Sequence, residues 1–286
     1  MIATRRAADV AVIGLGVIGG SVALRLRERG TEHRAFTTSS MDASRAASAG
    51  VTVSESLDDA VRDAGLVLIA VPLDRVCAVA ERVIHTAPEG ATILHAASLQ
   101  RPDALQLPPN TMERVIGTHP LAGSHGSGFA AARTDLFRDA TVFVEQRATA
   151  KQREDAELFW SLAGARHLAY LPAAAHDDAM AWVSHLPQLA STALAAALAL
   201  APTESEADTR VGPGARDATR LAMSTLEMWR PLLERAPAST VSALAALETT
   251  VGKLRTAVAS RDWQSVEQLW QRASEWRTGI ERGGQE

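Results

Sequence analysis

The histidine at position 119 is the residue of this chain best suited to proton transfer. It stands in the segment 115–129, VIGTHPLAGSHGSGF, among small residues that leave room for two bound molecules beside it. An imidazole titrates near neutral pH and can accept a proton from an alcohol that is being oxidised. We therefore predict that His119 is a general base, with a histidine that only caps a loop as the alternative.

A glycine-rich turn near the start of the chain predicts a dinucleotide site. The pattern G-x-G-x-x-G stands between the apolar run 9–13 and a helical pattern that ends at Gly30. The first glycine permits a tight turn, the second lets the backbone approach a pyrophosphate, and the third lets the helix pack closely. The helix then offers unpaired N–H groups to the phosphates. The predicted cofactor residues of this turn are Gly14, Leu15, Gly16, Val17, Ile18 and Gly19.

The end of the second predicted strand bears on the choice between NAD and NADP. NAD-selective sites usually carry an Asp or Glu there, bonded to the ribose hydroxyls. This chain has Thr37 at about that place, and Thr38, Ser39 and Ser40 could donate to a 2′-phosphate, with Arg34 or Arg45 to supply charge. Thr37, Thr38 and Ser39 are predicted cofactor residues. The sequence therefore slightly favours NADP over NAD. Two residues at the end of the apolar strand 66–71, Val71 and Pro72, complete the predicted cofactor site.

The elements that must position these residues change character along the chain. Short apolar runs alternate with helical patterns as far as residue 144, which predicts an α/β fold with a doubly wound parallel sheet. The predicted strands are 9–13, 33–37, 51–53, 66–71, 92–95, 115–117 and 141–144, and the predicted helices include 41–49, 57–64 and 74–86. From Lys151 onward Ala, Leu, Glu, Arg and Trp recur at helical spacing. We predict a Rossmann domain over residues 1–149 and an all-α substrate and dimerisation domain over residues 150–286.

Composition excludes several classes of protein. A chain of 286 residues exceeds a comfortable single core, and its 47% apolar and 22% charged residues are ordinary for a globular protein. A net charge of −4 gives no sign of binding to nucleic acid or acidic membranes. The single cysteine, Cys77, excludes an internal disulfide and a Cys-rich metal site, and we expect no metal. Because we find neither a signal peptide nor a long apolar span, we expect a cytoplasmic protein.

Four segments in order resemble the prephenate/arogenate dehydrogenase family. They are GLGVIGGS at 14–21, THPLAGSHGSG at 118–128, HDDAMAWVSHLP at 176–187, and ARDATRLA at 215–222 followed by MW at 228–229. The resemblance implies an oxidoreductase of tyrosine biosynthesis that uses NAD(P) for the oxidative decarboxylation of prephenate or arogenate. Hydride would leave ring carbon 4, and the ring carboxylate would leave as carbon dioxide.

The resemblance also implies roles for individual residues. His119 would assist deprotonation of the ring hydroxyl, and Ser98 would contact the same hydroxyl. Arg220 matches the arginine that binds a substrate carboxylate, a task suited to its fork of donors. His185 would lie in a polar network near the substrate. The alternatives are an exposed helix arginine for Arg220 and a buried structural histidine for His185.

Several positions depart from the family pattern. His95 stands where the family usually has an acidic residue, Gln100 where it has Lys, and Ala236 near the place of an Asn. His125, a substrate-binding candidate together with Ser124, often corresponds to Glu. These changes are compatible with an altered substrate such as 4-amino-4-deoxyprephenate, an antibiotic precursor. Loss of a negative charge at position 125 disfavours a substrate with an additional ammonium group, however, and prephenate remains the first prediction.

Two other functions are alternatives to the oxidative decarboxylation of prephenate. The 3-hydroxyacid dehydrogenases and imine reductases share the two-domain plan, but the hydroxyacid enzymes use a Lys early in the helical domain, where this chain offers only Lys151, at the boundary. A redox sensor that binds NADP without turnover is the alternative from another class. A sensor would not need a carboxylate clamp such as Arg220.

The resemblance implies a homodimer through the C-terminal helices. Trp263, Trp270 and Trp276 recur near the end of the chain, and we expect them to cover that seam or a core. His176 and Asp177 are expected to cap or anchor a helix rather than to take part in the chemistry.

Overall fold

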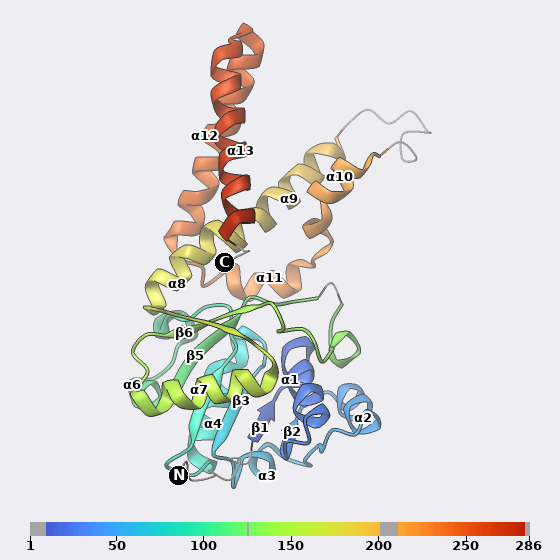
Figure 1. Cartoon of the computed structure of the whole chain (residues 1–286), viewed down its shortest axis with the longest axis vertical. Coiled ribbons are helices and arrows are strands. Elements are labelled where there is room, and N and C mark those ends of the chain that lie inside the picture. The colour runs from blue at the N-terminus through green and yellow to red at the C-terminus, as the bar shows by residue number, and fades with distance from the viewer. Residues whose placement is uncertain (1–9, 125, 201–210, 284–286) are drawn as a thin grey trace. The chain divides into compact units, whose positions relative to one another are not determined.

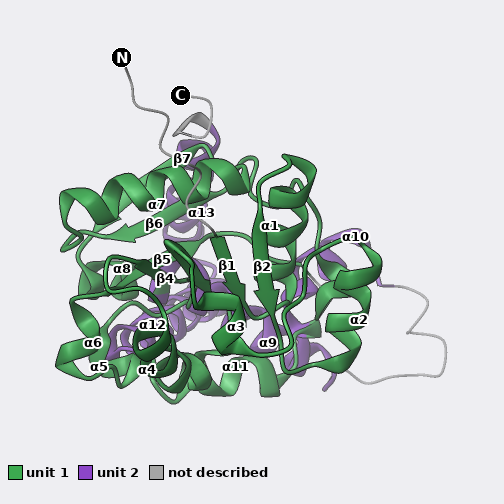
Figure 2. Ribbon diagram, turned by 90° about the horizontal axis from the view of Figure 1, so that it is seen from below, with its two compact units in different colours: residues 1–180, 223–236 green, residues 181–222, 237–286 purple. Residues whose placement is uncertain are grey.

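The computed structural model describes residues 10–124, 126–200 and 211–283. The chain forms two compact units, shown in green and purple in Figure 2. The first unit contains the residues up to Met180 together with 223–236, and the second contains 181–222 and the residues from Pro237 onward. The first unit therefore continues past residue 149, where composition predicts a domain boundary.

One sheet forms the centre of the first unit (Figure 1). Its strand order is β2-β1-β3-β4-β5-β6-β7, and neighbouring strands are parallel except for the antiparallel pair β5 and β6. The order reverses beside β1, as in doubly wound nucleotide-binding folds, which confirms the predicted fold class. The strands are β1 (Val10–Ile13), β2 (His33–Phe36), β3 (Leu66–Ile69), β4 (Thr92–His95), β5 (Val115–Pro120), β6 (Thr141–Glu145) and β7 (His167–Leu171).

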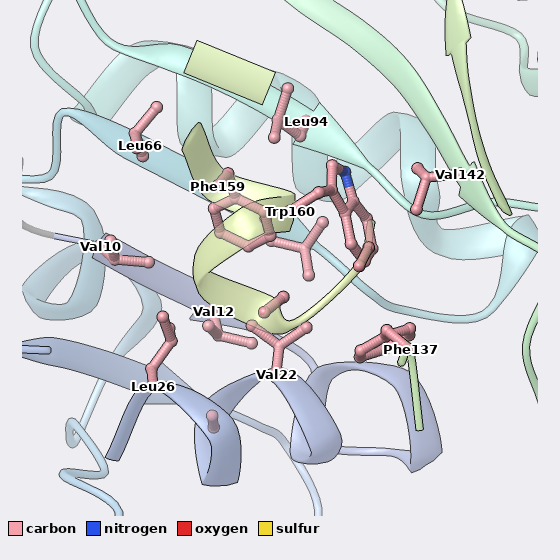
Figure 3. Packing of buried hydrophobic residues seen from close by; sticks show 14 of the residues in the cluster. Val10, Val12, Val22, Leu26, Leu66, Leu94, Phe137, Val142, Phe159 and Trp160 are labelled. Atoms are coloured by element: carbon pink, nitrogen blue, oxygen red, sulfur yellow. The ribbon is translucent and has the colours of Figure 1, made fainter. Parts of the chain in front are cut away.

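Both faces of this sheet are buried, and the central strands β1 and β3 are apolar at every position. In β1, Val10 and Val12 belong to the core on one face, while Ala11 and Ile13 belong to the core on the other. Successive side chains of a strand point to opposite faces, so a continuous apolar run requires helices on both sides. Figure 3 shows the first of these cores, in which Phe159 and Trp160 pack against strand and helix side chains.

Helices cover the two faces separately. Residues of α1 and α7 belong to the first core, and residues of α3 and α4 belong to the second. Side chains begin two of these helices: Ser56 caps α3, and Thr149 forms a capping box with Gln152 at α7. The helices are α1 (Val17–Glu28), α2 (Ser40–Ser48), α3 (Leu57–Val61), α4 (Val76–Thr86), α5 (Pro102–Leu105), α6 (Pro109–Met112), α7 (Ala150–Ala163), α8 (Ala173–Met180) and α11 (Leu226–Leu233), with 3-10 turns η1 (Leu73–Arg75) and η2 (Phe129–Ala131).

The sheet differs from the sequence prediction at three places. The predicted strand 51–53 is reduced to a single bridge between Val53 and Ala35. β5 extends to Pro120, beyond the predicted end at Gly117, because its last residues pair with β6. β7 was not predicted, and it lengthens the sheet by pairing with β6 along five residues.

The described residues of the second unit are helical. Its elements are the π-helical turn η3 (Ala181–His185), α9 (Leu186–Leu198), α10 (Pro213–Ala218), the 3-10 turn η5 (Arg220–Met223), whose last residue belongs to the first unit, α12 (Ala238–Ser260) and α13 (Trp263–Gly283). α12 packs against α9, η3 and α13. Within the described ranges, none of the helices combines the length and the apolar character needed to cross a membrane.

Candidate active site

The three glycines of the turn between β1 and α1 are subject to different constraints. Gly14 has φ +98°, and a Cβ there would lie 2.3 Å from the Ala70 carbonyl oxygen. A Cβ on Gly19 would lie 1.9 Å from the Gly14 carbonyl oxygen, whereas a Cβ on Gly16 would meet no atom within 4 Å. Packing of the protein itself therefore requires Gly14 and Gly19. Gly16 borders open space at the start of α1, as expected of a residue that a pyrophosphate approaches.

This difference gives a testable contrast. Gly16→Ala is expected to leave the melting temperature unchanged and to weaken dinucleotide binding by about tenfold or more, because the added methyl group takes the space of the phosphates. Gly19→Ala, the matched control, is expected to lower the melting temperature by several degrees, because its methyl group overlaps a backbone carbonyl. Calorimetric titration with the cofactor and thermal unfolding of both variants measure the two effects. Unchanged dinucleotide binding by Gly16→Ala would contradict the assignment.

The residues after β2 form a hydrogen-bonded turn. The Ser39 hydroxyl accepts the Asp42 N–H at 3.2 Å and caps α2, while the Ser39 N–H donates to Thr37 Oγ1 at 3.3 Å. The Asp42 carboxylate in turn accepts the Phe129 N–H at 2.9 Å. Thr37 and Ser39 therefore stabilise the local backbone, and a carboxylate stands in the first turn of α2.

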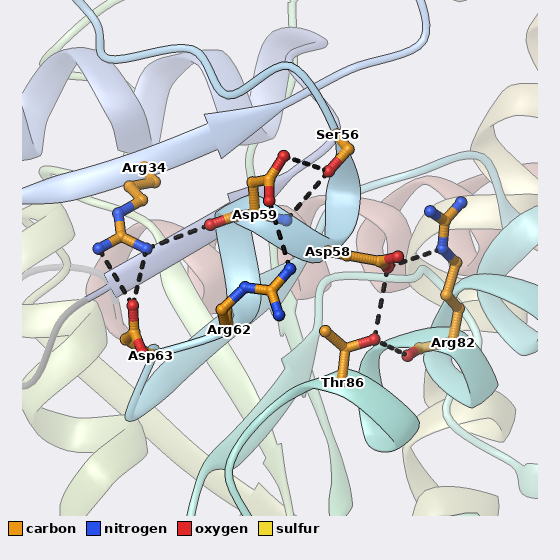
Figure 4. Close-up of polar contacts among 8 residues, drawn as sticks. All are labelled: Arg34, Ser56, Asp58, Asp59, Arg62, Asp63, Arg82 and Thr86. Carbon is orange, nitrogen blue, oxygen red and sulfur yellow. Dashed lines mark hydrogen bonds and ion pairs between the residues drawn. The ribbon is translucent and has the colours of Figure 1, made fainter.

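Arg34, one of the two cations considered for a 2′-phosphate, is held elsewhere. Its guanidinium donates to the Asp59 carbonyl oxygen at 3.1 Å and pairs with the Asp63 carboxylate at 3.3 Å (Figure 4). These contacts tie the second residue of β2 to α3 and the residues that follow it. Because ligands bind at the carboxyl ends of the strands, the structure gives Arg34 no role at the ribose.

His119 lies inside β5 rather than in a loop, and it is the first of three side chains in contact. Its Nδ1 lies 3.0 Å from Nε2 of His176, and Nδ1 of His176 lies 2.8 Å from Oδ1 of Asp177. His176 and Asp177 are buried in α8, with 1% and 0% of their surfaces exposed, whereas His119 is half-buried. A carboxylate and two imidazoles in this order can move and stabilise a proton.

Ser98 follows β4 at the same edge of the sheet. In the parallel register His95 of β4 pairs with Gly117 of β5, so Ser98 and His119 both lie just beyond this pair, toward the carboxyl ends of the strands. The backbone beside Ser98 is fixed, because the Gln100 side chain donates to the Ala97 carbonyl oxygen at 2.7 Å. The sheet therefore brings the two predicted catalytic residues to one edge.

Two departures from the family pattern, His95 and Gln100, are neighbours in the interior. A Cβ on Gly117 would lie 1.7 Å from Gln100 Oε1 and 3.1 Å from His95 Nε2, so both side chains lie against this glycine. Burial, with a smaller contribution from Arg147, lowers the pKa of His95 to about 3. His95 is therefore neutral, and two neutral side chains stand where the pattern has an acid and a lysine.

The predicted substrate residues His185 and Arg220 belong to the second unit. His185 ends the π-helical turn and is buried, with its Nδ1 2.9 Å from the Thr240 hydroxyl of α12. π-helical turns within helices are often found at functional sites. Arg220 is exposed at the start of η5. Two contacts from α9 hold the backbone on either side of Arg220: Gln188 donates to the Leu221 carbonyl oxygen at 2.8 Å, and Ser191 donates to the Ala218 carbonyl oxygen at 2.9 Å.

The motif that follows His119 forms an exposed loop. Ser124 accepts the Gly126 N–H at 3.2 Å, which makes a local turn, and His125 lies outside the described residues. The loop is attached to the nucleotide-binding side of the unit at its far end. There the Phe129 ring lies over Gly20 of α1, and the Arg133 N–H donates to the Ser21 hydroxyl at 3.0 Å.

Comparison with known proteins identifies the family. The family model described as the prephenate dehydrogenase nucleotide-binding domain matches residues 22–169, and the prephenate dehydrogenase dimerization domain matches residues 172–272. The chain is 32% identical to a cyclohexadienyl dehydrogenase of Zymomonas mobilis, over 88% of this chain and 89% of that protein. This chain belongs to the prephenate dehydrogenase family.

Further relatives agree with this membership. A prephenate dehydrogenase of Bacillus subtilis is 25% identical over 95% of this chain and 76% of its own. The crystal structure of a prephenate dehydrogenase from A. aeolicus, in complex with hydroxyphenyl propionate and NAD+, superposes with a TM-score of 0.85. At 22% identity over 97% of this chain and 99% of that one, it shows that the fold is shared. Members of this family are nicotinamide-dependent oxidoreductases, and the predicted enzyme class is confirmed.

The prephenate dehydrogenase motifs contain two residues whose contacts the sequence does not reveal. His176 and Asp177 were expected only to cap or anchor a helix, yet they bond to His119 and to the segment after β4. Their presence in one of the four matched segments was a usable signal. It gave no indication of a partner, because His119 lies 57 residues away in the chain.

Proposed function

We propose that this enzyme catalyses the oxidative decarboxylation of prephenate, with hydride transfer from ring carbon 4 to a nicotinamide cofactor. The observation that carries the proposal is the half-buried His119 on β5, backed by His176 and Asp177, on the same sheet edge as the glycine turn. The open space at Gly16 fits a pyrophosphate. The nicotinamide, when bound, accepts the hydride.

We propose distinct tasks for the protein side chains. His119 accepts the proton of the ring hydroxyl as hydride leaves carbon 4, and returns it to the same oxygen, which becomes the phenol of the product once carbon dioxide has left; Ser98 hydrogen-bonds this oxygen. Arg220 binds a substrate carboxylate through paired donors, and His185 supports the substrate site through the network that includes Thr240. Ser124 borders the substrate from the loop after β5, and His125, which lies outside the described residues, keeps the substrate-binding task that the sequence predicts. Loss of the ring carboxylate as carbon dioxide makes the reaction irreversible, because the product ring is aromatic.

We propose NAD as the preferred cofactor, with NADP as the alternative that the sequence favours. Arg34 is engaged by Asp63, and the Ser39 hydroxyl is used to cap α2. The Asp42 carboxylate in the first turn of α2 would repel a 2′-phosphate. The structural relative from A. aeolicus was crystallised with NAD+. Thr38 and Arg45 are the remaining candidates for contacts with a 2′-phosphate.

We also propose a homodimer formed through the helices of the second unit. Trp263, Trp270 and Trp276 of α13 are each exposed by more than 60% in the single chain. Several exposed tryptophans on one helix are costly unless another surface covers them. The match to a dimerization-domain model supports a second copy as that surface.

An absorbance assay of the reduced nicotinamide tests the function directly. Purified enzyme is incubated with prephenate and NAD, and separately with NADP, arogenate and 4-amino-4-deoxyprephenate. We expect the highest kcat/KM with prephenate and NAD. Turnover of the 4-amino compound alone would overturn prephenate in favour of a specialised substrate. Cofactor binding without turnover of any of these compounds would instead identify a redox sensor.

A further inference from the structure

We propose that His176 and Asp177 are positioning residues that hold His119 in the tautomer of a base, and that Asp177 also fixes the segment that carries Ser98. The proposal deepens the proposed function and rests on it, since it assigns a supporting structure to the residue that takes the proton. The sequence offers a plainer role for the pair, the anchoring of α8, which would leave the protonation of His119 unaffected.

The geometry of the three side chains is fixed by packing as well as by hydrogen bonds. The rings of His119 and His176 stand edge to face, with centroids 5.1 Å apart and an interplanar angle of 80°. Phe143 of β6 packs its ring 5.2 Å from that of His176. Phe143 is also the cross-strand partner of His119, so one aromatic side chain stands beside both histidines. With the backbone of His119 held in the sheet, neither imidazole is free to turn.

The positions of the hydrogens follow from the partners of Asp177. Its Oδ1 accepts the Gln100 N–H at 2.8 Å, and its Oδ2 accepts the Arg101 N–H at 3.0 Å. A backbone N–H can only donate, so both oxygens act as acceptors and the contact with His176 is a donation from Nδ1–H. Nε2 of a neutral His176 then accepts, and Nδ1–H of His119 donates to it. The lone pair of His119 is therefore on Nε2.

This arrangement suits both protonation states of His119. When Nε2 takes a proton from the substrate hydroxyl, the imidazolium keeps the same Nδ1–H bond, and no side chain has to move. The negative charge of Asp177 then stabilises the positive charge on His119 through the ring of His176. In serine proteases a buried carboxylate serves its histidine in a comparable way, setting the tautomer and stabilising the imidazolium.

Other charged groups around these side chains have partners of their own. His95 on β4 is neutral, because burial lowers its pKa to about 3. The remaining groups are Arg147, which pairs with Glu145 of β6, Arg101, which pairs with Asp103, and the exposed Asp178. Among the described residues, Asp177 is the carboxylate that hydrogen bonds link to His119, through His176.

Asp177 acts on the second catalytic segment through the backbone. Its two oxygens hold the N–H groups of Gln100 and Arg101, and Gln100 closes the turn onto the Ala97 carbonyl oxygen. Ser98 lies inside this turn. The buried carboxylate of Asp177 is therefore linked to His119 through His176, and also holds the backbone segment that carries Ser98. His119 and Ser98 are the two residues proposed to contact the ring hydroxyl of the substrate.

Nitrogen-15 NMR of the histidines in the full-length wild-type enzyme tests the tautomers without any reaction. We expect neutral His119 and neutral His176 both to carry the proton on Nδ1. Assignment of the resonances uses the variants His119→Asn and His176→Gln. A proton on Nε2 of neutral His119 would overturn the proposal. This result does not depend on turnover, so a wild-type enzyme inactive with every candidate substrate would remove the proposed function and leave the tautomer assignment standing.

The pH dependence of kcat tests the role of the charge. Asp177→Asn is expected to lower kcat by about 10- to 100-fold, as loss of a group that orients a functional histidine does. The midpoint of the acidic limb is expected to move to lower pH by about 0.5 unit or more, because the imidazolium of His119 loses a nearby negative charge. The matched control is Asp178→Asn, the same change at the exposed neighbouring residue, which should leave both quantities unchanged.

A role in folding alone would give a different result. Asp177→Asn would then lower the amount of active enzyme and its melting temperature, while the midpoint of the acidic limb stayed at the wild-type value. That outcome would overturn the proposal. If Asp177→Asn does not fold, the same measurement on His176→Gln decides, because this change breaks the contact between His119 and the carboxylate without removing the anchor for Gln100 and Arg101.

Discussion

Replacement of His119 by Asn is expected to lower kcat by about 100-fold or more while cofactor binding persists. An asparagine keeps a polar side chain of similar reach at this position of β5, but its amide cannot take a proton from the substrate hydroxyl. Because the residue lies inside a paired strand, the substitution is not expected to disturb the sheet. Steady-state turnover of prephenate and titration with NAD measure the two properties.

His167→Asn is the matched control for this prediction. His167 is an exposed histidine at the start of β7, so the same substitution there tests for an unspecific effect of losing an imidazole. We expect its kcat and KM to equal those of the wild type. Wild-type turnover by His119→Asn would exclude a general-base role for this residue.

Arg220→Ala is expected to weaken substrate binding by about 2–4 kcal/mol, because a carboxylate would lose its charged, paired donors. The effect should appear mainly as a higher KM for prephenate, with little change in the affinity for NAD. The exposed position of Arg220 on η5 makes a loss of stability from this change small. Initial rates at varied prephenate concentration, with NAD held at saturation, measure it.

Two further variants complete this test: one is a control at another arginine, and the other separates the geometry of the Arg220 side chain from its charge. Arg216→Ala removes another exposed arginine, on α10, and is expected to leave KM unchanged. Arg220→Lys keeps the positive charge without the planar fork, and we expect it to recover only part of the lost affinity. If Arg220→Ala binds prephenate as tightly as the wild type, the carboxylate is bound by another residue.

Much of the fold could be predicted because its signals are local. The strand, glycine turn and helix at residues 9–30 identify a nucleotide-binding unit within one short stretch of sequence. The apolar runs at β1 and β3 can be recognised because burial on both faces of a sheet favours apolar residues at every position of a strand. β7 was not recognised, since its residues HLAYL lie among helices and four of the five are only half-buried. Its pairing with β6 is a tertiary contact that periodicity does not record.

In the candidate site, too, local features could be predicted from the sequence and tertiary contacts could not. His119 and the glycines could be predicted from residue type and spacing. The contacts of His176 and Asp177 could not, because they depend on α8 folding against the ends of β4 and β5. The sequence also suggested Arg34 as a cation for a 2′-phosphate. Its guanidinium is instead bound by carboxyl and carbonyl groups of a segment about 25 residues later in the chain. Charge alone does not reveal whether an arginine already has a partner.

The pairing of β5 with both β4 and β6 has a consequence for how substrate preference can change among such enzymes. β4 pairs with the strand as far as Gly117, and β6 pairs with it from Thr118 to Pro120, so His119 has a rigid support. The connection that begins at Leu121 carries Ser124 outside the sheet. Insertions, deletions or substitutions in that connection can therefore accumulate among related enzymes while His119, the proposed base, keeps its place in the strand. Selection can thus change the substrate preference of such an enzyme while the proposed proton and hydride transfer stays the same.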